Sequence, residues 1–320
     1  MIKKIKFITT VPKLKIKERL DKIISILFNQ YSRSKIKQWI LDNNVKINEK
    51  IINEPKKKVS GGEIISILKN IEIISPLEPQ NIFLNIIYED NYIIVINKPC
   101  NQVVHPGAGN LNGTILNALL YHYPKNSKLP RAGIIHRLDK NTTGLMIIAK
   151  TVLTYNKLIT AMKSRNIIRN YEAIVIGKIS SKGTINQPIS RHPIKRTSMM
   201  VHPKGKLAIT HYNIIENFPN HTHLYIQLDT GRTHQIRVHM SYIKHPLVGD
   251  PIYNNQKYIL KNTSKTLIKT LHNFNRQALH ATKLTLIHPI NNIKMTWTIP
   301  KPHDMINLIN LLKSNKKNKI

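Results

Sequence analysis

Apolar residues lie three or four positions apart near the start of the chain, over residues 18–28 and again over residues 33–41. This spacing predicts two helices, each with one buried face. The two apolar stripes are Leu20, Ile23, Ile24 and Leu27, and then Ile36, Trp39 and Ile40. Two short β-like segments follow at residues 45–48 and 62–67, with turn signals between them. The pattern predicts a small module of two helices and short strands over residues 18–77.

From about residue 84, short β-branched runs predict strands that are buried on both faces. These runs lie at residues 92–97, 144–149, 171–176 and 224–229, and an alternating run follows at 294–299. Helical stretches are expected near residues 116–120, 152–162 and 304–312. Because strands and helices do not alternate regularly, the pattern favours a mixed, mostly antiparallel sheet flanked by helices over a doubly wound fold. The expected fold class is therefore α+β.

These patterns divide the chain into four parts. The module at residues 18–77 is followed by a proline-marked linker at 78–84 and a larger domain at 85–312. The Lys-rich segment at 313–320 is expected to be a disordered tail. With 320 residues, of which 41% are hydrophobic and 21% charged, the chain is long enough to fold into two domains.

The composition excludes several classes of protein. No apolar run approaches the length that spans a bilayer. The basic start of the chain lacks the apolar core and the small-residue cleavage site of a secretory signal. The single Cys100 cannot build a disulfide framework or a cysteine zinc cluster. We therefore expect a cytoplasmic protein that is not bound to a membrane.

The formal net charge of +34 indicates a polyanionic partner, because Lys and Arg bind phosphate by releasing condensed counterions. A chain encoded by AT-rich codons also accumulates Lys, so the lysine count carries less weight by itself. The arginines are fewer and fall mostly in the segments discussed below. The planar guanidinium of Arg binds phosphate and base edges in a way that Lys cannot. The arginine positions therefore indicate binding sites, and nucleic acid is the expected partner.

A glycine-containing loop follows the strand expected at residues 92–97. Gly107, Gly109 and Gly113 do not have the spacing of a dinucleotide-binding fingerprint, and the chain has no phosphate loop ending in Gly-Lys-Ser/Thr. Two interpretations stay open. The loop is either a structural turn or a segment that lets the backbone approach a substrate closely.

Asp139 lies in a polar turn, in the segment His136-Arg-Leu-Asp-Lys-Asn-Thr-Thr-Gly144. An Asp in such a place is often a turn-capping residue. Strand-like segments on both sides would instead hold the carboxylate rigidly beside Arg137, which suits a catalytic acid or nucleophile. Local chemistry favours neither interpretation over the other.

Arg237 lies within Gly231-Arg-Thr-His-Gln-Ile-Arg-Val-His239, which we interpret as an extended segment with Thr233, Gln235, Arg237 and His239 on one face. Burial of an unpaired guanidinium is expensive, so Arg237 needs a carboxylate, and we expect Asp139 to be its partner. This contact fits a salt bridge between two strands as well as a functional pair that faces a cleft.

The histidines give no metal-binding pattern. The chain has 15 of them, but it contains no His-Glu-x-x-His motif and no cysteine cluster. We expect surface groups or RNA contacts, and no metal site.

The order Glu18-Arg-Leu-Asp, Ser32-Arg-Ser-Lys-Ile and Val45-Lys-Ile-Asn resembles an S4 RNA-binding domain. The basic residues on the polar side of this module are Arg19, Arg33, Lys35, Lys37 and Lys46. The resemblance implies that they contact RNA, although a solvated basic face on a small α+β module would have the same pattern.

Three further segments resemble the signature motifs of the RluA/RluD family of ribosomal RNA pseudouridine synthases. They are His136-Arg-Leu-Asp-Lys-Asn-Thr-Thr-Gly-Leu145, Tyr171-Glu-Ala-Ile-Val-Ile-Gly177 and Gly231-Arg-Thr-His-Gln-Ile-Arg-Val-His239. The resemblance continues through Asn97-Lys-Pro99, His245-Pro-Leu-Val-Gly-Asp-Pro251 and Arg276-Gln-Ala-Leu-His-Ala281, and covers nearly the whole chain.

The resemblance implies isomerisation of uridines in 23S ribosomal RNA. The glycosidic C–N bond breaks, the uracil rotates and a C–C bond forms. Asp139 would act on the sugar as nucleophile or base, Tyr171 would stack on the flipped uracil, and Arg237 would hold Asp139 ionised and oriented. Arg137, with His136 beside it, would fill the gap that the flipped base leaves in the RNA.

No cofactor or metal is implied, because no group leaves and no electrons are transferred. The implied protein is a monomer that acts on 23S RNA, either free or in an assembling large subunit. The alternative from another class is a non-enzymatic S4-type RNA-binding factor for ribosome assembly. Such a factor would not need Asp139, Tyr171 and Arg237 together.

Overall fold

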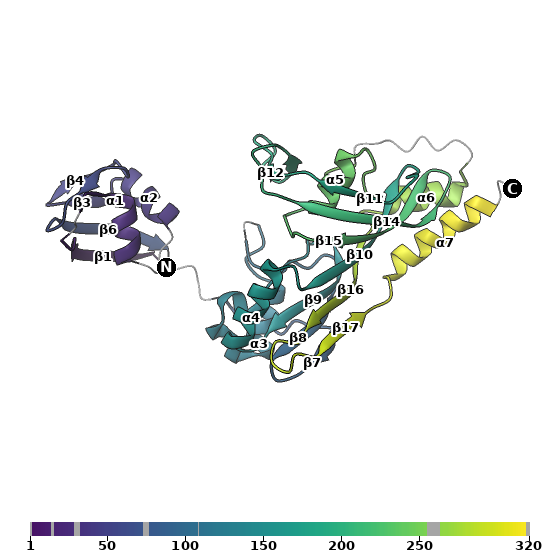
Figure 1. Cartoon of the computed structure of the whole chain (residues 1–320), viewed down its shortest axis with the longest axis horizontal. Helices are drawn as coiled ribbons and strands as arrows, with labels where there is room; N and C mark the ends of the chain where they lie inside the picture. The colour runs from purple at the N-terminus through teal and green to yellow at the C-terminus, as the bar shows by residue number, and fades with distance from the viewer. Residues whose placement is uncertain are drawn as a thin grey trace. The chain divides into compact units, whose positions relative to one another are not determined.

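The computed structural model describes residues 2–13, 16–28, 33–72, 77–107, 109–254 and 263–317. The chain forms two compact units, Met1–Leu77 and Glu78–Ile320 (Figure 1). Each unit has its own core. In the described ranges, no helix has the length and apolar character needed to cross a membrane.

The first unit combines two helices with a four-stranded sheet of order β1-β6-β3-β4. Its elements are β1 (Ile2–Thr10), β2 (Glu18–Arg19), α1 (Leu20–Leu27), α2 (Arg33–Leu41), β3 (Val45–Ile47), β4 (Lys50–Ile51), β5 (Lys58–Val59) and β6 (Ile64–Glu72). Ile24, Ile36 and Trp39 of the helices pack against Val45 and Ile65 of the sheet, so the apolar stripes form the core as predicted.

The first unit is larger than the predicted module at residues 18–77, because β1 belongs to it. All nine residues of β1 pair antiparallel with β6, from Ile2 opposite Glu72 to Thr10 opposite Ile64. The Lys-rich sequence of β1 has a weak apolar pattern, and its place in the sheet depends on backbone pairing with the long β6 strand.

The second unit is built on a nine-stranded sheet of order β11-β14-β15-β10-β16-β9-β8-β7, with β17 paired to β16. Its strands are β7 (Ile86–Glu89), β8 (Ile93–Lys98), β9 (Thr143–Ala149), β10 (Ile168–Ile176), β11 (Gly183–Asn186), β14 (Ile209–Asn217), β15 (His221–Leu228), β16 (Leu279–Ile287) and β17 (Lys294–Thr298). The pairs are antiparallel except that of β9 with β16. The prediction of a mixed, mostly antiparallel sheet is therefore confirmed.

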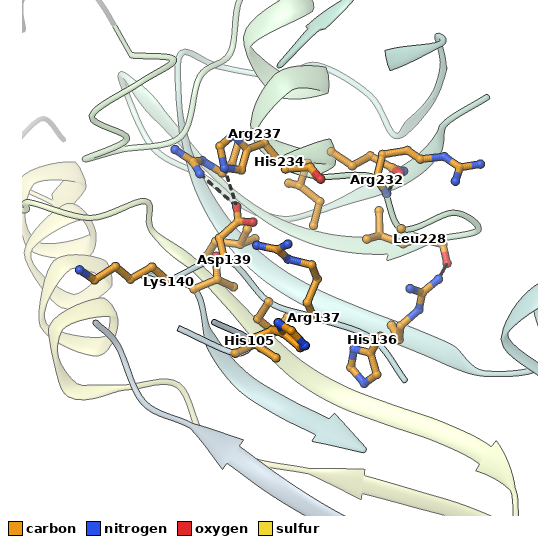
Figure 2. A pocket seen from close by; sticks show the side chains of 18 of the residues that line it. His105, His136, Arg137, Asp139, Lys140, Leu228, Arg232, His234 and Arg237 are labelled. Atoms are coloured by element: carbon orange, nitrogen blue, oxygen red, sulfur yellow. Dashed lines mark hydrogen bonds and ion pairs between the residues drawn. The ribbon is translucent and has the colours of Figure 1, made fainter. Parts of the chain in front are cut away.

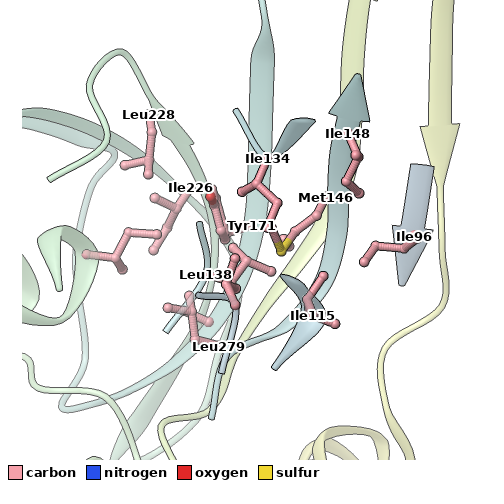
Figure 3. Close-up of a cluster of buried hydrophobic side chains, with 14 of the residues drawn as sticks. Ile96, Ile115, Ile134, Leu138, Met146, Ile148, Tyr171, Ile226, Leu228 and Leu279 are labelled. Atoms are coloured by element: carbon pink, nitrogen blue, oxygen red, sulfur yellow. The ribbon is translucent and has the colours of Figure 1, made fainter. Parts of the chain in front are cut away.

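Helices cover both faces of this sheet. They are α3 (Ile115–His122), α4 (Val152–Lys163), α5 (Gln235–Tyr242), α6 (Lys265–Asn273) and α7 (His303–Lys317), and β12 (Ile189–Arg191) pairs separately with β13 (Met199–Val201). Because side chains alternate along a strand, Ile94 and Ile96 of β8 belong to the core cluster of α3, whereas Ile93 and Val95 belong to that of α4. Figure 3 shows the first of these clusters, which includes Tyr171.

Strand β16 lies near the middle of the sheet, although its sequence did not predict a strand. Its buried residues include His280, Thr282 and Thr285, which weaken the apolar pattern. Hydrogen bonds to neighbouring segments hold these polar groups: His280 Nδ1 bonds to the Thr143 hydroxyl, and the Thr282 hydroxyl donates to the Ile299 carbonyl. A buried strand that carries paired polar groups is not visible to a hydrophobicity pattern.

Two segments outside the predicted domain differ from the expectations. Residues 78–84 pack on the second unit, because Asn117 donates to the Glu78 carbonyl and accepts from the Gln80 amide through its own carbonyl. They are therefore not a free linker. Helix α7 continues to Lys317, into the segment expected to be a disordered tail, and residues 318–320 lie outside the described residues.

Candidate active site

Five of the residues selected from the sequence line one cavity of about 1010 Å³ in the second unit (Figure 2). They are His136, Arg137, Asp139, Tyr171 and Arg237. The glycine-containing loop after β8 also contributes to the wall, from Val103 to Gly107. The interpretation in which this loop approaches a substrate therefore agrees with its position.

Asp139 lies in the loop that leads into β9. Its backbone carbonyl accepts a hydrogen bond from the Thr142 amide at 3.1 Å, so the segment is a turn as well as a part of the cavity. Two hydrogen bonds connect this loop to β16 and to the segment just before β16. Gln277 Nε2 donates to Thr142 Oγ1 at 2.9 Å, and His280 Nδ1 bonds to Thr143 Oγ1 at 2.8 Å. These bonds fix the residues that directly follow Asp139.

Arg237 lies on a helix, and the extended segment expected at this position is wrong. The apolar residues Ile236, Val238 and Met240 alternate as in a strand, because the helix is buried on two sides. Ile236 and Met240 join the main core, whereas Val238 packs against Ile189 and Ala208. A helix with apolar contacts on opposite faces does not show the one-sided period of 3.6 residues.

The expected pair between Arg237 and Asp139 is confirmed, with Nη1 and Oδ2 3.0 Å apart. Arg237 also binds Asp250, through Nε at 2.7 Å and Nη2 at 2.9 Å, and its guanidinium lies 5.1 Å from the centre of the Tyr253 ring. Burial opposes the charge, but Asp250 and then Asp139 raise the pKa of Arg237 above its usual value. The sequence reasoning required a carboxylate for Arg237 and missed that it has two.

Tyr171 lies on β10 with 5% of its surface exposed, and its ring borders the cavity. Leu138, Ile226 and Leu279 surround it in the apolar core (Figure 3). Burial raises the pKa of Tyr171, so its hydroxyl keeps its proton at neutral pH. The cavity therefore has one aromatic wall, with the Asp139–Arg237 pair in the same cavity.

Residues 92–242 match the model of a family described as RNA pseudouridylate synthase, and residues 18–65 match the S4 domain. The chain is 52% identical over 315 residues to ribosomal large subunit pseudouridine synthase D of Escherichia coli strain K12, covering 98% of this chain and 97% of that protein. The chain belongs to the RNA pseudouridine synthase family. A protein of the same name from Haemophilus influenzae is 53% identical over 298 residues, covering 93% of this chain and 92% of that protein.

A solved structure shares the fold of this pseudouridine synthase. Human RNA pseudouridylate synthase domain containing 4 aligns with a TM-score of 0.56 and 24% identity, over 72% of this chain and 93% of that chain. This likeness shows the fold alone. The family resemblance and the α+β fold expected from the sequence are confirmed.

Lys98 of the synthase is a buried residue that sequence reasoning did not select. Its ammonium group donates to the carbonyls of Pro99, Gln102 and Lys140, at 2.7, 2.9 and 2.9 Å. Burial lowers the pKa of Lys98 to about 8. Because Lys140 follows Asp139 directly, Lys98 ties the loop after β8 to the loop of the catalytic candidate.

His136 and Arg137 differ in their surroundings. Both line the cavity (Figure 2). Arg137 is exposed, whereas His136 accepts a hydrogen bond from the Ile147 amide at 3.1 Å. Burial, together with the charge of Arg169, lowers the pKa of His136 to about 3, so its ring is neutral. His136 therefore fits a wall residue better than a group that inserts into RNA.

In the S4 unit of the synthase, Arg19 and Arg33 both bind the buried carboxylate of Asp21, at 2.9 to 3.1 Å. Their side chains remain 40% and 48% exposed. The other three residues expected to contact RNA are less constrained: Lys35 lies over the Trp39 ring at 5.8 Å, Lys37 is exposed, and Lys46 pairs with exposed Glu49 at 3.5 Å. Asp21 therefore positions the two arginines and leaves their faces accessible.

Proposed function

We propose that this enzyme isomerises specific uridines to pseudouridine in the 23S RNA of the large ribosomal subunit, with Asp139 as the residue that acts on the sugar. The names of the similar bacterial proteins supply the substrate class. The observation that carries the proposal is the Asp139–Arg237 pair in a cavity that also has Tyr171 in its wall.

Asp139 starts the reaction by acting on the target ribose, through attack at C1′ or removal of a proton from C2′. Either route breaks the bond between C1′ and N1 of the uracil. The uracil rotates and C5 bonds to C1′, while the ester bond to Asp139 breaks in the first route or the proton returns from Asp139 to C2′ in the second. C5 then loses its proton and N1 gains one. Atoms and electrons balance without a redox partner, so the chemistry requires the carboxylate and positioning.

Arg237 orients Asp139, because its Nη1 donates a hydrogen bond to Oδ2 at 3.0 Å. Tyr171 offers an aromatic face to the flipped uracil, and its neutral hydroxyl assists removal of the C5 proton. Base–aromatic stacking supplies binding energy on the order of 1–3 kcal/mol.

Arg137 is proposed to fill the space that the target base leaves in the RNA, since it is exposed and two residues from Asp139. The S4 unit adds phosphate contacts through Arg19, Arg33, Lys35, Lys37 and Lys46. The net charge of +34 supports a polyanionic substrate.

We further propose that the enzyme acts in the cytoplasm as a monomer. All groups proposed for catalysis come from one chain, so a second copy has no residue to supply. The RNA substrate is either free or part of an assembling particle.

The test is to incubate the purified protein with a 23S RNA transcript and with large-subunit particles from cells that lack it, and to map pseudouridines by carbodiimide modification and primer extension. The expected result is new pseudouridine at defined positions in at least one substrate. If the wild-type protein forms none in either, the proposed function is wrong and the interpretation as a binding factor remains.

Asp139→Asn tests the catalytic assignment in the same assay. It should abolish product while RNA affinity stays within about twofold, because phosphate contacts dominate binding. Asp229→Asn is the matched control, since Asp229 lines the same cavity but pairs with Arg165 and His211. Activity of Asp139→Asn close to that of Asp229→Asn would contradict the assignment.

A further inference from the structure

His234 precedes α5 in a backbone conformation that is unusual for its residue type. Its φ of 56° and ψ of 20° lie in the left-handed region, which residues other than glycine rarely adopt. This conformation brings the imidazole to the cavity, beside Arg237 and close to the Asp139 carboxylate (Figure 2). Residues with unfavourable backbone geometry cluster at functional sites, so the His234 side chain is a candidate for a role in this cavity.

The hydrogen bonds of Tyr253 determine where the His234 ring carries its proton. The Met199 amide donates to the Tyr253 oxygen at 2.7 Å, so this oxygen already acts as an acceptor. His234 Nδ1 lies 2.8 Å from the same oxygen. Among the described residues, this nitrogen is the acceptor that the phenol hydrogen can reach. Tyr253 therefore donates to Nδ1.

The proton of the neutral ring is then on Nε2. Burial lowers the pKa of His234 below its usual value, in agreement with a neutral ring. Nε2 lies 3.9 Å from Asp139 Oδ2, which is too far for a hydrogen bond. One oxygen atom placed beside both groups can accept from Nε2 and donate to Oδ2. A hydroxyl group has this combination of one donor and free lone pairs.

We propose that His234 recognises the 2′-hydroxyl of the target uridine, which accepts a hydrogen bond from Nε2 and donates one to Asp139. The inference rests on the proposed function, because it takes Asp139 to act at the sugar. The 2′-hydroxyl is attached to the carbon next to C1′, so it is the hydroxyl that lies nearest to the bond being broken. It is also the group by which a protein distinguishes RNA from DNA.

The same contact fixes the sugar against the carboxylate. An oxygen bound to both His234 and Asp139 holds C1′ and C2′ at a constant position relative to Oδ2. Proximity of this kind contributes to the rate in addition to affinity. His234 therefore selects ribose and orients it for Asp139.

The test uses two short RNAs that carry the mapped target, one unmodified and one with 2′-deoxyuridine at that single position. The wild-type enzyme should convert the deoxy substrate at least tenfold more slowly under single-turnover conditions. His234→Gly removes the ring, and glycine adopts the left-handed conformation without strain. This variant should lose at least tenfold on the ribose target and less than threefold on the deoxy target.

Added imidazole should restore the His234→Gly rate on the ribose target and leave the deoxy rate unchanged. Tyr253→Phe provides a second variant that keeps the His234 ring but removes the donor to Nδ1. It should reduce the ribose preference to less than threefold, with its melting temperature measured as a folding control.

Equal losses on the two substrates in His234→Gly would overturn the proposal, as would a wild-type enzyme without ribose preference. A water molecule held between His234 and Asp139 in place of the hydroxyl would give such equal losses. The proposed function fails in a different way, because the wild-type enzyme would then form no pseudouridine in either RNA.

Discussion

Asp250 binds the guanidinium of Arg237 through both carboxylate oxygens, at 2.7 and 2.9 Å. The Asp250 side chain has no exposed surface, whereas that of Asp139 is 16% exposed at the cavity. Asp250 therefore fixes the orientation of Arg237, and the remaining nitrogen, Nη1, points to Asp139. Two carboxylates share one cation, and the one that faces the cavity is bound through a single contact.

Asp250→Asn should lower kcat by about tenfold to a hundredfold, because a small displacement of Arg237 moves Asp139 out of its reactive position. The KM for RNA should change less than twofold, since Asp250 is buried. Steady-state kinetics on a target RNA measure both values. Asp21→Asn is the control, because Asp21 is a buried carboxylate shared by two arginines in the other unit. An unchanged kcat in Asp250→Asn would contradict this role.

Tyr171→Phe separates stacking from proton transfer. The phenyl ring keeps the aromatic face, so RNA affinity should stay within about threefold, whereas loss of the hydroxyl should lower the single-turnover rate at least tenfold. Tyr171→Leu should weaken binding as well, by about 1–3 kcal/mol. Filter binding and single-turnover assays give the two quantities. A Phe variant with the wild-type rate would leave stacking as the only role of Tyr171.

Deletion of residues 1–77 should raise the KM for RNA at least tenfold and leave the rate at saturating RNA within threefold. The second unit retains its own core and every residue of the cavity, so the chemistry does not depend on the S4 unit. The slope of log affinity against log salt should fall by about 0.7–0.9 for each phosphate that the shortened protein no longer neutralises. Lys37→Ala, which removes one exposed charge, gives a smaller step in the same direction. Loss of turnover at saturation would contradict this division.

The stability of the second unit should fall as the pH decreases from 6.5 to 5. Burial is the leading cause that lowers the pKa of His136 to about 3 and the pKa values of His221 and His280 to about 4. The unfolded chain binds protons near pH 6.5 that the folded chain does not, so acid favours unfolding. Each histidine contributes a slope that rises from about 0.7 kcal/mol per pH unit at pH 6.5 to about 1.4 near pH 5, as its unfolded form becomes fully protonated.

Urea unfolding of the Trp39→Phe variant, followed by Trp297 fluorescence, reports this stability for the second unit. His280→Asn should reduce the slope by about one proton, and His303→Gln, at an exposed position, should leave it unchanged. A free energy of unfolding that stays constant between pH 6.5 and 5 would exclude this linkage.

The sequence predicted those parts of the fold whose burial is one-sided or complete. The apolar stripes of the S4 unit have a helical period, and β8, β9, β10 and β15 are continuous apolar runs, and each forms the predicted element. The Asp139–Arg237 pair followed from the cost of an unpaired buried guanidinium. These features depend on local composition or on a rule of charge balance.

The features that were missed depend on contacts between distant segments. Helix α5 is buried on two sides, and β16 carries a buried histidine that bonds to β9. The bond between His234 and Tyr253 needs the loop at residues 249–254 to fold back onto α5, and no local pattern encodes that return. Tertiary packing decides these positions.

The active-site charges come from segments that are far apart in the order of synthesis. Asp139 and Arg237 are 98 residues apart, and the Asp139 loop also depends on β16, close to the end of the chain. A nascent chain on the ribosome first exposes the carboxylate, then its arginine, and only afterwards the strand beside the loop. A chain truncated before β16 should therefore keep the basic charge of the S4 unit but lack the bonds that hold the Asp139 loop.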